Sequence, residues 1–345
     1  MSELKGRILV TGGTGYIGAH TVVALQNNGY EVVIIDNLSN SNIRILEQIK
    51  SITGKAPAFE KLDLRDKQAI MGFLQTHKDI TGIIHFAASK SVSESVKNPL
   101  LYYDNNLSSL VNLLTALQGR EVNFVFSSSC TVYGEPDELP VTERAPIKKA
   151  TSPYGNTKQI GEEILQEAAN ATADLKVIAL RYFNPVGAHP SALIGELPNG
   201  VPQNLVPFIT QTAIGKRETL TVFGDKFDTP DGSCIRDFIH VVDLARAHVA
   251  AIERMEAKQM AANYEVFNVG TGNGYSVLQL IRTFEKVTGE PLNYRIGPPR
   301  DGDIVKIWGD VSLAEKELNW KAENDLTGML TSAWAWEKYI NENPF

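Results

Sequence analysis

A tyrosine and a lysine that lie four positions apart are the residues of this chain best suited to acid–base chemistry. They are Tyr154 and Lys158, in the segment SPYGNTK that begins at Ser152. A phenol is a poor base at neutral pH because its unperturbed pKa is about 10, but an ammonium group beside it favours the phenolate and lowers that pKa. Because positions i and i+4 share one face of a helix, a single helix can hold the pair together. The spacing predicts an activated tyrosine; a solvated surface pair is the alternative.

Three consecutive serines, Ser127, Ser128 and Ser129, lie upstream of this pair at the end of an apolar run. A hydroxyl at that place can bind the reacting oxygen of a substrate and relay its proton. The spacing does not say which serine would do so. The next residue, Cys130, has no His or Asp partner nearby that could activate a thiol nucleophile, so we expect a small buried residue there.

A glycine-rich turn, with Gly12, Gly15 and Gly18, follows the first apolar run and opens a predicted helix. Glycine permits a tight turn and a close approach of the backbone to a pyrophosphate, which the helix N-terminus then faces. Asp36, at the end of the next predicted strand, can accept hydrogen bonds from ribose hydroxyls and would repel a 2′-phosphate. The pattern predicts an NAD site in preference to an NADP site; a purely structural turn is the alternative.

Short apolar strands alternate with helical segments through the first half of the chain. We predict strands at 7–11, 31–36, 58–61, 82–87, 123–128 and 176–182, and helices at 17–28, 100–118 and 154–171. Ser152 and Pro153 suit the N-cap and the first position of the last of these helices. Such alternation is typical of an α/β, Rossmann-type fold with a doubly wound parallel sheet, whose carboxyl edge carries the functional groups.

The pattern changes after about residue 185, where prolines and glycines mark irregular connections. Helices are predicted again at 205–215, 242–255 and 277–288, in a smaller α/β C-terminal domain. The run 266–270 resembles a strand that could rejoin the large sheet. We therefore expect a dinucleotide-binding domain over 1–184, with later segments of about 236–272 rejoining it, and a substrate domain over most of 185–345.

Composition and charge restrict the classes of function. The chain has 345 residues, is 43% hydrophobic and 21% charged, and carries a formal net charge of −7. An acidic chain of this kind is not expected to bind nucleic acid or an anionic membrane as its main activity. Its two cysteines provide neither a disulfide framework nor a metal-binding pattern, and no apolar run suits a signal peptide or a membrane span. We expect a cytoplasmic protein without a metal.

The helix predicted at 100–118 is apolar on more than one face, because it carries Leu107, Leu110, Val111, Leu113, Leu114 and Leu117. A helix that packs only against its own sheet should show one apolar stripe. The surplus predicts either a dimer interface or deep burial within one chain, and the sequence leaves both open.

Two arginines and a histidine of the second half are candidates for ligand contacts. Arg236 and Arg300 lie near predicted turns, and guanidinium groups are well suited to a diphosphate. Ion pairs at the surface or within the chain are the alternative for either arginine. His240 lies among apolar residues, so we expect a hydrogen-bonded core histidine there.

Six motifs together carry a resemblance that spans nearly the whole chain. They are TGGTGYIG (11–18), DNLSNS (36–41), SSSCTVYG (127–134), SPYGNTK (152–158), RYFNP (181–185) and RDFIHVVDLA (236–245). With these motifs the chain resembles the UDP-glucose 4-epimerases of the extended short-chain dehydrogenase/reductase family. The resemblance implies a cytoplasmic, homodimeric isomerase that uses NAD and acts on a UDP-sugar.

The family's residue roles carry over to the matching positions. Tyr154 would be the acid/base, Lys158 its activator and a contact of the nicotinamide ribose, and Ser129 the hydroxyl that holds the sugar 4-oxygen. The implied NAD contacts are Gly12, Gly15, Tyr16, Ile17, Gly18, Asp36, Asn37, Leu38, Ser39, Asn40, Ser41, Asp63, Leu64, Phe86, Ala87, Ala88, Lys90, Asn106, Tyr154, Lys158 and Tyr182. The implied UDP-sugar contacts are Ser129, Tyr154, Phe183, Asn184, Asn204, Leu205, Thr221, Val222, Phe223, Arg236, Arg300, Asp303 and Ile307.

The mechanism implied by the resemblance moves a proton and a hydride off the sugar and back. The Tyr154 phenolate removes the proton of the 4-hydroxyl while C4 gives its hydride to NAD. The 4-ketose, held by its UDP end, turns its other face to the cofactor, and hydride and proton return. NAD is regenerated in every turnover and should stay bound. The UDP end supplies the binding energy, so the sugar itself can be held loosely enough to rotate.

The chain departs from the family pattern at two places. Residues 86–89 read FAAS, where bacterial members often have Gly-Leu in the last two positions. Ile307 precedes Trp308 where some members have tyrosine and others a smaller residue, and this position limits the room beside the sugar's 2-substituent. We expect UDP-glucose and UDP-galactose to be the main substrates, with N-acetylhexosamine nucleotides as additional candidates.

Four other functions are alternatives to epimerisation. A 4,6-dehydratase of the same fold usually needs Asp-Glu where this chain has Cys130-Thr131. The motifs alone do not exclude a nucleotide-sugar ketoreductase or decarboxylase. A non-catalytic NAD-sensing protein could dispense with Tyr154 and Lys158, yet both are present together with Ser129.

Overall fold

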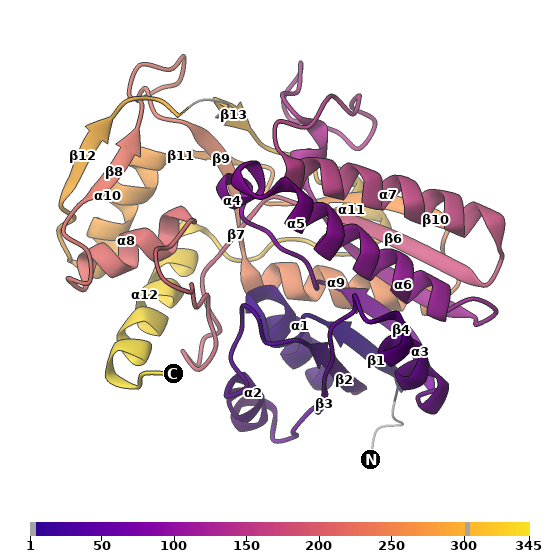
Figure 1. Cartoon of the computed structure of the whole chain (residues 1–345). Helices are drawn as coiled ribbons and strands as arrows, with labels where there is room; N and C mark the ends of the chain where they lie inside the picture. Colours follow the sequence, from indigo (N-terminus) through magenta and orange to yellow (C-terminus); the bar gives the residue numbers. More distant parts are fainter. Residues whose placement is uncertain (1–4, 301–303) are drawn as a thin grey trace.

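The computed structural model describes residues 5–300 and 304–345, and a seven-stranded parallel sheet forms its centre (Figure 1). The strand order is β10-β6-β5-β4-β1-β2-β3, and all pairs are parallel. The strands are β1 (Lys5–Thr11), β2 (Tyr30–Asp36), β3 (Ala58–Lys61), β4 (Ile80–His85), β5 (Val122–Ser129), β6 (Leu175–Tyr182) and β10 (Tyr264–Val269). The sheet confirms the predicted α/β, Rossmann-type fold.

Helices cover both faces of this sheet because its strands carry apolar side chains on both sides. One core contains Ile8 and Val10 of β1 and residues of α1 (Tyr16–Asn27), α2 (Ile45–Thr53), α9 (Val241–Glu256) and α11 (Ser312–Glu317). The opposite core contains Leu9 and residues of α3 (Lys67–Thr76), α6 (Ser109–Ala116) and α7 (Pro153–Ala171). Alternate residues of the same strand therefore serve opposite faces.

The helix predicted at 100–118 is present over 99–116, but it is not regular. After α4 (Val92–Lys97) the chain forms α5 (Pro99–Tyr103), a π-helical turn η1 (Asp104–Ser108) and α6. The turn contains buried Asn106, whose Nδ2 donates to Ser89 O and Thr157 Oγ1, both at 3.0 Å. These long-range hydrogen bonds explain the irregularity, and π-helical turns inside helices are frequent at functional sites.

The second half of the chain forms two smaller sheets. β9 (Ile235–His240) pairs with β7 (Asn184–Val186), β11 (Gly274–Ser276) and β13 (Lys306–Ile307). β8 (Leu220–Phe223) pairs with β12 (Tyr294–Gly297). α8 (Leu205–Ala213), α10 (Val277–Thr288) and α12 (Leu326–Glu342) enclose a core of their own around Phe284 and Trp334.

The chain returns from the second half to the large sheet at α9 and β10 and again at α11. The strand predicted at 266–270 is β10, which lies beside β6, and α9 packs against α1. β9, in contrast, belongs to a smaller sheet, so only part of 236–272 rejoins the large one. The domain boundary at residue 184 stays a prediction. Within the described ranges, no helix is both long and apolar enough to cross a membrane.

Candidate active site

Residues from distant parts of the sequence meet at the carboxyl edge of the large sheet. β1 ends in the glycine turn, β5 ends in the three serines and β6 ends at Tyr182. β1 and β4 are neighbours although β2 and β3 lie between them in the chain, so the strand order reverses at this point. In open α/β sheets the crevice at such a reversal is where ligands bind.

The glycine turn has no room for side chains. Gly12 has a φ of 71°, and a Cβ there would lie 2.8 Å from the main-chain N of Ala87. A Cβ at Gly18 would lie 2.3 Å from Gly12 O. Gly15, the N-cap of α1, offers no side-chain acceptor to the first N–H groups of the helix. The turn therefore presents backbone donors and a positive helix end to an anion such as a pyrophosphate.

Asp36 ends β2 next to the glycine turn and ties the following loop to it. Its carboxylate accepts hydrogen bonds from Thr14 N at 3.2 Å, Leu38 N at 2.9 Å and Ser41 Oγ at 3.2 Å. The side chain is buried. A carboxylate held here suits a ribose with free hydroxyls and disfavours a phosphorylated one.

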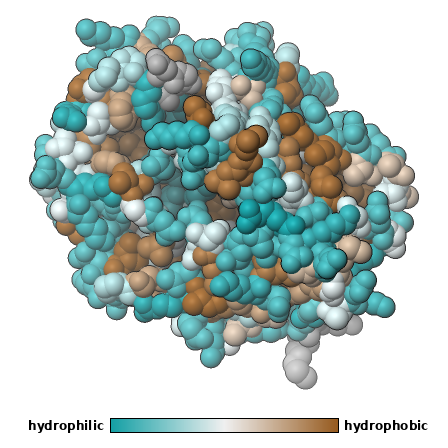
Figure 2. Space-filling model, viewed as in Figure 1, coloured by the Kyte–Doolittle hydropathy of each residue, from teal (hydrophilic) through white to brown (hydrophobic). Residues whose placement is uncertain are grey.

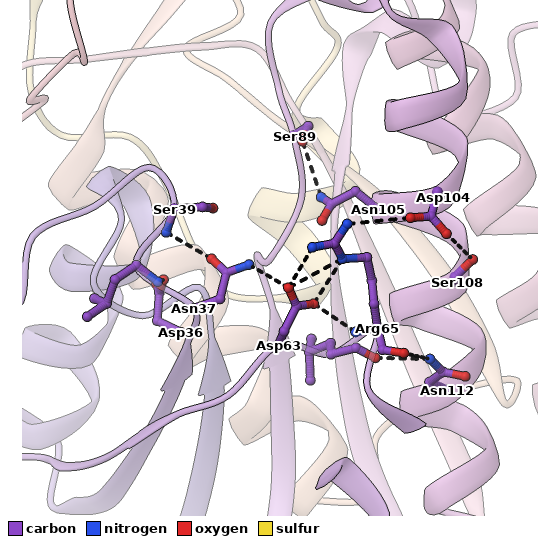
Figure 3. Close-up of polar contacts among 12 residues, drawn as sticks. Asp36, Asn37, Ser39, Asp63, Arg65, Ser89, Asp104, Asn105, Ser108 and Asn112 are labelled. Atoms are coloured by element: carbon purple, nitrogen blue, oxygen red, sulfur yellow. Dashed lines mark hydrogen bonds and ion pairs between the residues drawn. The ribbon is translucent and has the colours of Figure 1, made fainter. Parts of the chain in front are cut away.

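Asp63 lies beside this loop and is held by an arginine that the sequence analysis missed (Figure 3). Asn37 Nδ2 donates to Asp63 Oδ2 at 3.2 Å, and Arg65 donates from Nε to Oδ1 at 3.1 Å and from Nη2 to Oδ2 at 2.8 Å. Hydrogen bonds from Arg65 lower the pKa of Asp63 to about 2. The signal in the sequence was the spacing: an arginine two residues after the aspartate can turn back onto it.

The segment after β4 connects the two halves of the site. Phe86 contacts His248 with ring centroids 4.7 Å apart. Lys90 forms an ion pair with Glu196 at 3.2 Å, and Asn204 Nδ2 donates to the same carboxylate oxygen at 2.6 Å. Glu196, which the sequence analysis did not single out, thus joins a predicted cofactor residue to a predicted substrate residue. No local motif marked it, because its ion-pair partner Lys90 is distant in the chain.

The structure brings Tyr154, Lys158 and Ser129 together. α7 begins at Pro153, and the hydroxyl of its N-cap Ser152 accepts a hydrogen bond from Gly155 N at 3.1 Å, as the sequence predicted. The Ser129 hydroxyl lies close enough to the Tyr154 hydroxyl to lower the pKa of the phenol. Lys158 Nζ lies 5.9 Å from the centroid of the Tyr154 ring. All three side chains are buried.

Burial controls the protonation of this group. It raises the pKa of Tyr154, with a further increase from Tyr182 and a smaller decrease from Ser129, and it lowers the pKa of Lys158 to about 8. Lys158 directs its ammonium to Ser127 O at 2.6 Å. The expectation that the lysine lowers the tyrosine's pKa is therefore wrong for the chain by itself, because desolvation of the phenol outweighs it. The phenolate needs a further positive charge in the site.

The residues expected to hold the UDP-sugar lie on the smaller sheets and their connections. Arg236 of β9 and Ile307 of β13 are register partners, and the Arg300 guanidinium lies 4.7 Å from the centroid of the Phe223 ring. Asp303 lies outside the described residues. The other candidates lie after β6, before and at the start of α8, and in β8: Phe183, Asn184, Asn204, Leu205, Thr221, Val222 and Phe223.

Two expectations about single residues can be compared with the structure. Cys130 is buried, and burial raises the pKa of its thiol to about 12, which disfavours a nucleophilic thiolate. His240 Nδ1 accepts from Val242 N at 3.1 Å, and its Nε2 contacts Ser332 Oγ at 3.0 Å. It is the predicted hydrogen-bonded core histidine.

Comparison with known proteins decides the family. Residues 8–270 match the model of the NAD dependent epimerase/dehydratase family. The chain belongs to this family. It is 46% identical, over 98% of both chains, to the UDP-glucose 4-epimerase of Erwinia amylovora.

Two solved structures resemble this member of the epimerase/dehydratase family closely. The UDP-glucose 4-epimerase of Stenotrophomonas maltophila, solved with NAD and formylated UDP-arabinopyranose, has a TM-score of 0.94 and 48% identity, covering 98% of this chain and 100% of that one. The enzyme of Bifidobacterium longum, solved with NAD+ and UDP, has a TM-score of 0.93 and 45% identity with the same coverage.

The residues at the carboxyl edge fit the NAD of the epimerase/dehydratase family. The glycines let the turn pack tightly against the backbone of Ala87, and the uncapped start of α1 leaves its first N–H groups without a side-chain partner, which suits a pyrophosphate. Asp36 suits the adenosine ribose, and Lys158 and Tyr182 suit the nicotinamide end. Tyr182 is fixed there by a 2.5 Å hydrogen bond between its hydroxyl and Ser127 Oγ.

Proposed function

We propose that this chain interconverts UDP-glucose and UDP-galactose by transient oxidation of the sugar at C4. The observation that carries the proposal is the position of the Ser129 hydroxyl beside the Tyr154 hydroxyl, with Lys158 on the same face of α7. This group lies where the cofactor edge of the large sheet meets the smaller sheets. Relatives that share 45–48% of the sequence over nearly all of this chain are UDP-glucose 4-epimerases, which supports the same activity here.

The residues of the chain move one proton while the cofactor handles the hydride. NAD, when bound, supplies the hydride acceptor and a positive charge close to the phenol. Tyr154 takes the proton of the sugar 4-hydroxyl on its phenolate oxygen, and Ser129 holds the same sugar oxygen. Lys158 stabilises the phenolate. After the sugar has turned, Tyr154 returns the proton to the 4-oxygen, so that the net change is inversion at C4.

The UDP end of the substrate provides the binding energy in this proposal. Arg236 and Arg300 suit the diphosphate, and the N-terminus of α8 next to Asn204 offers further donors. No such grip is needed on the sugar, because a ring held rigidly could not present both faces to the cofactor. The same arrangement explains why tight uridine binding and a mobile sugar are compatible.

The product of UDP-galactose decides between this function and its alternatives. The purified protein should convert UDP-galactose to UDP-glucose without added nicotinamide, as followed by chromatography or proton NMR. A 4-keto-6-deoxy product would identify a dehydratase instead. A protein that retains NAD but forms no product would contradict the proposal and favour a sensor.

We propose the substrate range from the surroundings of Ile307. Its side chain is 3% exposed and belongs to an apolar cluster with Cys130, Val132 and Phe183. Isoleucine leaves more space beside the sugar than tyrosine would, but less than a small residue. Hexose nucleotides are then the main substrates, and N-acetylhexosamine nucleotides are weaker ones.

A homodimer is the proposed assembly. Five apolar side chains of α4, α5 and α6 remain exposed, and Figure 2 shows hydrophobic groups gathered over the face where Figure 1 places α4 and α5. Their exposed fractions are Leu100 80%, Val96 61%, Val92 48%, Val111 45% and Leu101 44%. A contiguous apolar surface of this kind usually marks a protein contact. A second copy of the chain is the occupant we propose. This agrees with the homodimer that the sequence motifs led us to expect.

The cytoplasm is the proposed location. A nucleotide-sugar substrate and a cysteine-poor sequence are typical of that compartment. Fractionation of cells that express the full chain would show the protein among the cytoplasmic enzymes; recovery with membranes or in the medium would contradict this.

A further inference from the structure

A buried network of charged groups lies next to Lys158 on α7. Glu162 follows one helical turn later and is 7% exposed, and Arg181 of β6 is 6% exposed. Arg181 donates from Nε to Glu162 Oε1 at 2.9 Å, and the Ser128 hydroxyl donates to the same oxygen at 2.5 Å. Arg181 also donates from Nη1 to the Tyr133 hydroxyl at 3.1 Å. The carboxylate thereby connects the catalytic helix to β5, β6 and the 3₁₀ turn η2 (Cys130–Tyr133).

Lys158 depends on this network because it has no ion pair of its own. Among residues 5–300 and 304–345, no carboxylate lies within ion-pair distance of its ammonium, whose hydrogen bond goes to Ser127 O. Glu162 is the acidic group whose charge favours the protonated lysine, against the effect of burial. Positions 158 and 162 share one face of the helix, so the two charges are neighbours.

The remaining titratable groups that face Lys158 carry no negative charge. From β4, burial lowers the pKa of His85 to about 3, so the ring is neutral at the working pH. From β6, burial raises the pKa of Tyr182 to about 12. Tyr154 on α7 is the phenol that the lysine serves. Glu162 is therefore the source of negative charge for this lysine within the described part of the chain.

Further groups face Glu162 from the other packed elements, and they leave its charge in place. Tyr264 of β10 contacts Glu162 and stays neutral, because burial raises its pKa. Glu143, in the segment between η2 and α7, reaches Arg181 through its main-chain oxygen, while its carboxylate accepts from Asn268 N at 2.8 Å. Arg181 is therefore the direct counter-charge of Glu162.

Loss of the carboxylate charge would leave two buried cations side by side. A guanidinium cannot be deprotonated in a protein, so Arg181 would keep its charge. The ammonium of Lys158 can lose its proton and is the group that would yield. A neutral lysine would no longer stabilise the Tyr154 phenolate.

We infer that Glu162 is a positioning residue for the reaction: paired with Arg181, it keeps Lys158 protonated so that Lys158 can support the Tyr154 phenolate. The inference rests on the proposed epimerase function. It predicts effects of opposite sign for the two partners. Removing Glu162 favours neutral Lys158, whereas removing Arg181 leaves Glu162 to favour the ammonium more strongly.

The dependence of kcat on pH, measured with UDP-galactose from pH 6 to 10, tests the inference. Glu162→Gln should move the alkaline decline of kcat to lower pH by about one unit or more, a tenfold change in the proton equilibrium. Arg181→Met should move it to higher pH. The double variant should return it close to the wild-type position. Glu163→Gln, one residue further on the exposed side of α7, is the matched control and should leave the profile unchanged.

A purely structural role would give a different pattern. It would lower kcat equally at all pH values in both single variants, and the double variant would be worst because it has lost the most hydrogen bonds. That result overturns the inference. So does a folded Glu162→Gln variant in which kcat declines at the same alkaline pH as in the wild type. If Glu162→Gln does not fold, Arg181→Met and the double variant still test the predicted signs. A wild-type protein without epimerase activity would instead remove the proposed function.

Discussion

Ser129 at the end of β5 lies beside Tyr154 in the first turn of α7, close enough for its hydroxyl to lower the pKa of the phenol. The two hydroxyls belong to elements that are positioned independently, one by the ladder with β6 and the other by the Ser152 cap. Each element therefore keeps its place when the other's hydroxyl is removed. The contact can thus be broken chemically without disturbing the fold around it.

Tyr154→Phe removes only the phenolic oxygen from this contact. We expect the turnover of UDP-galactose to fall by about 100- to 10,000-fold, because a general acid–base contributes on that scale. Binding of NAD and of UDP-glucose, measured by calorimetry, should remain within a few-fold of wild type. Retention of most of the rate would contradict the assignment of Tyr154 as the group that moves the proton.

The role of the glycine turn can be tested with two Gly→Ala substitutions, one in the turn and one in a helix away from the site. Gly18→Ala places a Cβ 2.3 Å from Gly12 O, so the turn must open and bound NAD should be lost. Gly72→Ala, in the exposed part of α3, meets no atom within 4 Å. It should raise the free energy of unfolding by about 0.5–1 kcal/mol, since alanine is the better helix former. NAD content after purification and urea unfolding measure both effects. Normal NAD content in Gly18→Ala would contradict the pyrophosphate role of the turn.

The strands and most helices were predictable because their signals are local. Burial on both faces makes the inner strands of the parallel sheet largely apolar runs, and Ser152-Pro153 marks the start of α7. The π-helical turn was not predictable, because hydrogen bonds from Asn106 to Ser89 and Thr157 produce it. Nothing within residues 100–118 encodes those partners.

The site shows the same division between local and distant causes. The motifs identified Tyr154, Lys158 and Ser129, whose side chains the fold does bring together. Glu196 escaped notice because its ion-pair partner Lys90 comes from another segment. The prediction that the pKa of Tyr154 is lowered was wrong. Sequence neighbours indicate a nearby charge but give no measure of desolvation, which here has the larger effect and raises the pKa.

Ile307→Ala should change the preference between substrates. The smaller side chain opens space in the cluster with Cys130 and Phe183, so the turnover of UDP-N-acetylglucosamine relative to UDP-glucose should rise severalfold. Unfolding free energy should fall by about 2–5 kcal/mol, because a buried isoleucine leaves a cavity. Ile281→Ala, in a different core, provides the control for lost stability alone. An unchanged ratio of the two turnover rates would show that this position does not border the sugar's 2-substituent.

Four buried histidines should make the fold sensitive to acid. Burial lowers the pKa of His20 and His85 to about 3 and of His240 and His248 to about 4. Between about pH 4 and 6.5 the unfolded chain then binds more protons than the native state, so stability rises with pH in this window and is lost as pH falls. Each histidine contributes about 1.4 kcal/mol per pH unit there.

Among the described residues, two carboxyl groups act in the opposite direction, since burial raises the pKa of Glu143 as well as that of Asp237. Burial raises the pKa of Asp237 to about 6, so the native state takes up a proton there that the unfolded chain does not, and this offsets about one histidine. Urea unfolding at pH 7, 6 and 5 should show that the free energy of unfolding declines steeply as the pH falls. The decline should be less steep in His248→Gln. Equal stability at pH 7 and 5 would contradict the neutral buried histidines.

Leu100→Glu should separate the proposed dimer. Leu100 is 80% exposed in the single chain, so the charge costs the fold of the monomer little. In an interface formed by α4 and α5 of two copies, the same change removes two buried leucines, each of which contributes about 1.5–3 kcal/mol, and brings two carboxylates close together. Light scattering after size-exclusion chromatography should give the mass of one chain for Leu100→Glu and of two for the wild type. Leu313→Glu, on α11 at the other face of the sheet, is the control and should remain a dimer. If both variants had the mass of a single chain, that result would argue against this interface.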